Sequence, residues 1–149
     1  MKKILIALLI SILLLAAGWK ISNSSQFQFF GTLVDNVSKP DSVIALTFDD
    51  GPTPGYTEEV LHVLDSMDVK ATFFVIGRSV EKNMHEARLI VKDGNELGNH
   101  SWSHNRMVFK SMEFIRREIE KTDQVIRKAG YNGEICFRPP YGKKLFILP

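Results

Sequence analysis

The chain of 149 residues has a single cysteine, Cys136, so no intrachain disulfide can form. It also lacks a marked excess of one charge, since 19 basic and 17 acidic side chains give a formal net charge of +2. Basic residues are mixed with acidic ones, as in Arg116-Arg117-Glu118, which argues against a nucleic-acid-binding surface. Internal repeats and low-complexity tracts are absent, and the length suits one domain with a hydrophobic core. Nothing in the sequence indicates an oligomeric state.

One long apolar run is present, from Ile4 to Trp19, and Lys2 and Lys3 precede it. A basic start followed by an apolar stretch is typical of a secretory signal. As a helix rising about 1.5 Å per residue the run would span roughly 24 Å, against about 30 Å for a bilayer core. Cleavage near Ala16-Ala17-Gly18 and retention as a signal-anchor are both open; retention is favoured because no small-x-small site stands clear of the apolar stretch. We therefore expect residues 1–20 to direct export, with the lysines cytoplasmic and the remainder outside the cell.

Residues 21–42 form a predicted linker that contains an aromatic cluster. The linker is polar over Ser22–Ser25, and Phe27, Phe29 and Phe30 follow. Such aromatic side chains cap a hydrophobic core more often than they bind a ligand.

Beyond the linker, apolar strand-like runs alternate with helical patterns. The predicted strands are Val43–Leu46, Ala71–Ile76, Glu96–Asn99 and Ile135–Phe137. The predicted helices are Thr57–Met67, Val80–Asp93 and Met112–Ala129, the last with Ser111 as its N-cap and Gly130 after its end. This alternation predicts an α/β fold with a parallel sheet.

Two adjacent carboxylates, Asp49 and Asp50, follow the first apolar run within the segment Thr47–Pro52. Active sites of α/β proteins lie where parallel strands end. Neighbouring carboxylates repel each other, so a metal, a shared proton or a cationic partner must stabilise them. Taken alone, the segment is equally compatible with a solvated acidic turn.

Two further motifs follow later predicted strands. His100 and His104 are four residues apart, close enough to converge on one ion. The segment Arg138–Gly142, of sequence Arg-Pro-Pro-Tyr-Gly, follows the last predicted strand. Each motif alone is weak evidence, because histidine pairs occur by chance and such a turn is more often only a rigid loop. Their order, each after a predicted strand, is specific.

With these three motifs the chain resembles the polysaccharide deacetylases with a NodB-type domain, carbohydrate esterase family four. The resemblance runs from about Val43 to Pro149. It implies a distorted (β/α) barrel and metal-dependent removal of N- or O-acetyl groups from sugar polymers such as peptidoglycan or chitin. The family also has an acidic segment ending in Asp-Trp and a Leu-x-Leu-His strand that carries the general acid, and neither occurs in this sequence.

Residues 43–149 are therefore expected to be the N-terminal part of such a domain, a partial barrel. An alternative is a catalytically impaired fragment that binds metal or sugar without turnover. A sheet with part of its strands would leave an unpaired edge and an uncovered apolar face. On this basis we expect the chain alone to fold poorly and to have little N-deacetylase activity.

The resemblance implies that Asp50, His100 and His104 bind one divalent metal. This set of oxygen and nitrogen ligands suits a catalytic zinc with an open fourth position. Cobalt, nickel or manganese can compete, because ligand type alone does not select the metal.

The resemblance likewise makes Asp49 the general base that takes a proton from the attacking water, and Arg138 the residue that orients this base. The backbone N–H of Tyr141 is expected to help stabilise the tetrahedral oxyanion. Pro139 and Pro140 have no N–H, so Tyr141 offers the first backbone donor after Arg138.

Other candidates are weaker. His62 and His85 are expected on helix surfaces. Trp102, between the two metal histidines, can either stack on a sugar or pack beside the site. Tyr56 is expected to be a loop tyrosine rather than a substrate ligand, and Cys136 a small buried hydrophobic residue.

Overall fold

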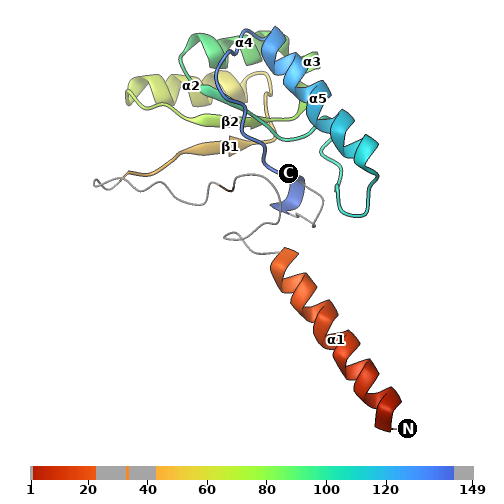
Figure 1. Cartoon of the computed structure of the whole chain (residues 1–149). Helices are drawn as coiled ribbons and strands as arrows, with labels where there is room; N and C mark the ends of the chain where they lie inside the picture. Colours follow the sequence, from red (N-terminus) through yellow and green to blue (C-terminus); the bar gives the residue numbers. More distant parts are fainter. Residues whose placement is uncertain (1, 23–32, 34–42, 143–149) are drawn as a thin grey trace.

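The computed structural model describes residues 2–22, 33 and 43–142. The aromatic cluster of Phe27, Phe29 and Phe30 lies outside these residues. Helix α1, Lys2–Ser22, is long and apolar enough to cross a membrane, and none of it is buried against the remainder of the chain. A signal sequence has the same features. In Figure 1 this helix projects away from the other elements.

The remaining elements form an α/β unit (Figure 1). Three parallel strands have the order β1-β2-β3, and an isolated parallel bridge joins Asn99 to Phe137 beyond β3. The strands are β1 Thr47–Asp49, β2 Thr72–Val75 and β3 Glu96–Asn99. The helices are α2 Tyr56–Ser66, α3 Gly77–Lys82, α4 Met84–Lys92 and α5 Met112–Lys128, and a 3₁₀ turn covers Pro140–Gly142. The predicted α/β class with a parallel sheet is confirmed.

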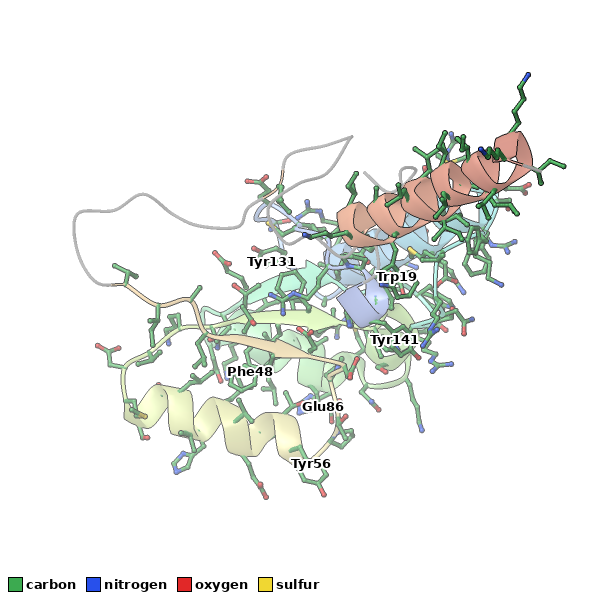
Figure 2. All side chains as sticks on the ribbon, turned by 90° about the horizontal axis from the view of Figure 1, so that it is seen from below. Trp19, Phe48, Tyr56, Glu86, Tyr131 and Tyr141 are labelled. Carbon is green, nitrogen blue, oxygen red and sulfur yellow. The ribbon has the colours of Figure 1, made fainter. Side chains whose placement is uncertain are left out.

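The core lies between the sheet and its helices. Phe73 of β2 pairs in register with Phe48 of β1 and Leu97 of β3. The Phe48 ring stacks on the Phe73 ring with centroids 5.1 Å apart, and Figure 2 shows Phe48 between the sheet and α2. The fully buried side chains at the centre are Val75, Val80, Ala87, Ile90 and Ile126. Strand β2, rich in aromatic and β-branched residues, is the central strand of the three.

Helix α5 forms as its sequence predicts. The Ser111 side chain caps it by accepting a hydrogen bond from the Phe114 N–H at 3.2 Å. Gly130 follows its end with a φ of 98°, a left-handed conformation that favours glycine. Its buried face includes Ile115, and it packs against α3 and β3. Met112, its first residue, is exposed.

The predicted single helix over Val80–Asp93 is wrong: two helices meet at Asn83. This residue has φ −121° and ψ 52°, outside the helical region. Its side-chain Nδ2 donates to the Pro52 carbonyl at 2.9 Å. An asparagine side chain that bonds to distant backbone competes with helix continuation, which accounts for the break.

The predicted strand over Val43–Leu46 is also displaced. Strand β1 begins at Thr47, and Ile44 is 92% exposed. Only the Leu46 carbonyl joins the sheet, by accepting from the Thr72 N–H. Thr47 pairs with Thr72, the first residue of β2, so the apolar run before Thr47 extends beyond the start of its neighbouring strand.

Cys136 is exposed, which corrects its predicted burial. The segment Ile135–Phe137 pairs through a single bridge rather than as a full strand. Side chains of an extended segment alternate in direction, so Ile135 and Phe137 are half-buried while Cys136 points outward. Its carbonyl still accepts a hydrogen bond from the Asn99 N–H at 2.8 Å.

Candidate metal and catalytic site

The three sequence motifs meet at the carboxyl end of the sheet. Asp49 ends β1, His100 follows β3, and Arg138 follows the bridge at Phe137. Strands lie about 4.8 Å apart, so Arg138 would be roughly 14 Å from β1 in a flat sheet. The long Arg138 side chain crosses the central strand to reach Asp49, with its guanidinium carbon 3.9 Å from the centre of the Phe74 ring.

Asp50, His100 and His104 form a three-ligand cluster. The Asp50 Oδ1 atom lies 3.2 Å from His104 Nε2 and 3.6 Å from His100 Nε2, and all three candidate ligand atoms lie within 4.8 Å of one another. Ligands held about 2.0–2.1 Å from a tetrahedral zinc are separated by about 3.3 Å. The spacing of this cluster therefore fits a small divalent metal.

The tautomer of His100 is the one that a metal ligand at Nε2 needs. Its Nδ1 atom lies 2.8 Å from the Arg138 carbonyl, which can only accept, so Nδ1 carries the hydrogen. In a neutral ring the Nε2 lone pair then faces the oxygen of Asp50. Two acceptors that face each other need a cation or a proton between them, and a carbonyl that orients a ligand histidine in this way is usual at metal sites.

Asp49 has a different set of partners from Asp50. Its Oδ1 accepts a hydrogen bond from Arg138 Nη1 at 2.6 Å, and the same nitrogen also donates to Thr47 Oγ1 at 3.1 Å. The other oxygen, Oδ2, lies 4.0 Å from His100 Nε2, so it faces the metal cluster from outside ligand distance. The structure thus separates the two aspartates, one beside the histidines and one held by an arginine.

Backbone conformation produces this separation. Asp50 has a φ of 73°, as His104 and Tyr141 have φ values of 58° and 61°. Left-handed backbone costs about 1–2 kcal/mol for an ordinary residue, although aspartate tolerates it better than most. Such conformations persist at functional sites when surrounding contacts hold them.

Tyr141 lies beside the cluster, with its ring centroid 4.9 Å from that of His104. Arg106 is a neighbour that the sequence did not predict, with its guanidinium carbon 5.0 Å from the centre of the Tyr141 ring. The structure therefore brings Asp49, Arg138 and Tyr141 together with the three candidate metal ligands.

The weaker candidates lie away from the cluster. His62 and His85 are exposed on α2 and α4, as expected. Tyr56 is the first residue of α2 and 72% exposed, and Figure 2 shows it at the periphery of the domain. Trp102 is half-buried against the hydrophobic core, and Lys121 Nζ lies 3.4 Å from the centre of its ring. Of its two predicted roles, the structure favours packing.

Buried polar residues around the histidines were not found from the sequence. Asn99 is 1% exposed and donates its side-chain amide to Asp123 Oδ1 at 2.7 Å and to the Ile119 carbonyl at 2.9 Å. Burial of Asp123 raises the pKa of its carboxyl, against the opposing effect of the Asn99 hydrogen bond. Glu118 is 5% exposed. On sequence, both acids belonged to an ordinary charged helix.

The fold and the cluster define an α/β protein with a candidate metal site at the ends of its parallel strands. The sequence profile of the family described as polysaccharide deacetylase matches residues 36–145. The chain belongs to the polysaccharide deacetylase family, carbohydrate esterase family four (CE4), with a NodB-like domain. Its described sheet and helices are a partial CE4 fold.

Two curated relatives illustrate the similarity. Peptidoglycan-N-acetylmuramic acid deacetylase PdaC of Bacillus subtilis is 41% identical over 109 residues, which is 72% of this chain and 23% of that protein. A peptidoglycan-N-acetylglucosamine deacetylase of Bacillus cereus is 40% identical over 103 residues, covering 68% of this chain and 37% of the relative. The chain thus spans less than two fifths of the length of these relatives.

Solved structures agree. The structure of PdaC superposes with a TM-score of 0.66 at 41% identity, covering 72% of this chain and 54% of PdaC. A CE4 family pseudoenzyme from Bacillus anthracis superposes with a TM-score of 0.64 at 36% identity, covering 70% of this chain and 37% of that one. Because the family includes a pseudoenzyme, membership alone does not establish catalysis, and the residues of the site must be considered.

Proposed function

We propose that this chain provides the metal centre and general base of a deacetylase that removes acetyl groups from N-acetylated polysaccharide of the peptidoglycan type. One observation carries the proposal: Asp50, His100 and His104 converge on a point that Asp49, held by Arg138, also faces. The substrate class comes from the relatives, two of which are named as peptidoglycan deacetylases.

The proposed metal is zinc, held by Asp50, His100 and His104, with cobalt, nickel or manganese as substitutes. When bound, it polarises the acetyl carbonyl and makes water acidic enough to attack near neutral pH. Each imidazole contributes Nε2, and the Arg138 carbonyl holds the His100 ring in the required tautomer.

Asp49 is the proposed general base. Its Oδ2 is free of the Arg138 bond and faces the cluster, so it can take a proton from the attacking water as the oxygen adds to the acetyl carbon. Arg138 fixes the rotamer of Asp49. The Tyr141 N–H donates to the carbonyl oxygen as negative charge develops there.

Cleavage of the C–N bond leaves an amine that must gain a proton. The family resemblance assigns this step to a histidine on a Leu-x-Leu-His strand, a segment that does not occur in these 149 residues. The full reaction is therefore proposed for a protein of the relatives' length. We assign to the residues described here the attack half of it.

The attack half can be tested separately with an aryl acetate ester. Its phenolate leaves without protonation, so hydrolysis needs only the metal, the base and the oxyanion donor. We expect the zinc-loaded chain to hydrolyse 4-nitrophenyl acetate faster than the same chain treated with a chelator. Equal rates with and without zinc would contradict the proposal.

A second candidate function is metal or sugar binding without turnover, because one structural relative is described as a pseudoenzyme. The retention of Asp49, its Arg138 partner and all three metal ligands favours catalysis. Zinc binding without ester hydrolysis would support the second candidate.

For location, we propose that α1 carries the domain to the outer face of the membrane as a signal or anchor. Its apolar length and the two lysines at its start support this orientation.

A further inference from the structure

The two metal histidines lie on a turn that carries an unusual number of constraints. Within residues 101–104, Ser101 and His104 both have left-handed backbone, with φ values of 67° and 58°. Neither is a glycine, so the turn is strained and requires outside contacts to persist. The direction of the His104 ring, and hence its 3.2 Å approach to Asp50, depends on this turn.

Side chains satisfy three backbone N–H groups of the turn. The Ser101 N–H donates to Asn99 Oδ1 at 2.8 Å, and the His104 N–H donates to Ser101 Oγ at 3.0 Å. Both of these bonds are local, formed within the motif. The Ser103 N–H is different, because it donates at 2.8 Å to the Glu118 Oε2 atom on α5.

Glu118 makes a second bond to the same residue, since Ser103 Oγ also donates to Oε2 at 2.8 Å. The Glu118 residue is 5% exposed. Within the part of the chain that the structure describes, no ion pair involves Glu118. A buried carboxylate is costly unless its oxygens accept hydrogen bonds, so the bonds to Ser103 are what makes its burial tolerable.

The other side of the turn rests on α3. The Ser101 and Trp102 carbonyls accept hydrogen bonds from the Gly77 and Arg78 N–H groups at 3.0 and 3.1 Å. A Cβ on Gly77 would lie 2.5 Å from the Trp102 ring and 2.6 Å from Thr122 Oγ1 of α5. The histidine turn is therefore held between α3 and α5, and Glu118 bonds to it from the α5 side through Ser103.

The geometry points to Glu118 as a positioning residue of the metal site: its buried carboxylate fixes Ser103 and thereby aims the adjacent His104 at the metal. The inference rests on the metal site proposed above. Glu118 itself touches neither metal nor substrate, so its effect must appear as altered metal affinity and ligand geometry.

Cobalt binding by the full chain in detergent provides the test, because the visible spectrum of Co²⁺ reports its coordination and a chromophoric chelator in competition reports its affinity. We expect Glu118→Ala to weaken binding about tenfold and to change the spectrum, since outer partners of metal ligands typically contribute 10–100-fold. Glu118→Gln keeps an acceptor for the Ser103 N–H and is expected within about threefold of wild type.

Two controls separate positioning from stability. Glu120→Ala removes an exposed acid from the same helix and should leave affinity and spectrum unchanged. Val125→Ala creates a cavity under α5 and should lower Tm without changing the cobalt spectrum. Ser103→Ala, which removes one of the two bonds while retaining the acid, tests the same contact if Glu118→Ala does not fold.

The outcomes discriminate between the two proposals. The metal site stands if wild type binds cobalt and His104→Ala does not. The positioning role is then wrong if Glu118→Ala or Ser103→Ala matches Glu120→Ala in cobalt affinity and spectrum. If wild type binds no cobalt, both proposals are wrong.

Discussion

Replacement of Asp49 by asparagine tests the division of roles between the adjacent aspartates. The change preserves shape and an acceptor for Arg138 Nη1, now 2.6 Å from Oδ1, but removes the charge. Exchanging a charge-assisted for a neutral hydrogen bond costs about 1 kcal/mol, and less here because both side chains are more than one third exposed. Loss of a general base instead lowers the rate about 10²–10⁴-fold, or about 3–5 kcal/mol. The effect on catalysis should therefore exceed the effect on stability.

Metal binding should survive the same change. Asp49 Oδ2 lies 4.0 Å from His100 Nε2, and the cluster has its carboxylate from Asp50. We expect zinc titration of Asp49→Asn to give one site with near wild-type affinity, while aryl acetate hydrolysis by the same sample falls at least about a hundredfold. Asp50→Asn is the matched control, expected to lose the metal. If Asp49→Asn loses zinc and Asp50→Asn retains it, the two roles have been assigned the wrong way round.

Three further predictions follow from other parts of the structure. His100→Ala should abolish the single zinc site in isothermal titration, and equal affinity in variant and wild type would contradict the ligand assignment. Asp123→Asn should alter the pH dependence of stability: burial raises the pKa of Asp123 in the folded state, so the wild-type contribution is greatest below its ordinary value of 3.8 and is lost as the pH rises through the folded pKa. In urea unfolding of the metal-free proteins, the free energy of unfolding of the variant should therefore rise relative to that of wild type from about pH 4 towards neutrality. A difference that does not change with pH would refute this. The chain should fractionate with membranes through α1, with its domain digested by protease added to wall-free cells, whereas a protected cytosolic product would contradict the proposed orientation.

Much of the fold follows from local pattern. Helix α5 is encoded by its apolar spacing, the Ser111 cap and the glycine after its end, all of which act over a few residues. The candidate metal ligands were also accessible, because three short motifs each stand after a predicted strand and parallel strands place their carboxyl ends at one edge.

Contacts between distant residues decided the remainder. The break at Asn83 depends on the Pro52 carbonyl 31 positions earlier, and the exposure of Cys136 depends on a single bridge to Asn99. The bond from Arg138 to Asp49 joins residues 89 positions apart, which meet only because the sheet brings their segments to one edge. From the sequence Glu118 could not be distinguished from a surface acid, because the pattern of the helix around it does not reveal the contact with Ser103. The sequence therefore determined which chemical groups are present at the strand ends. The orientation of these groups depends on burial and on long-range hydrogen bonds, which exist only after the chain has packed.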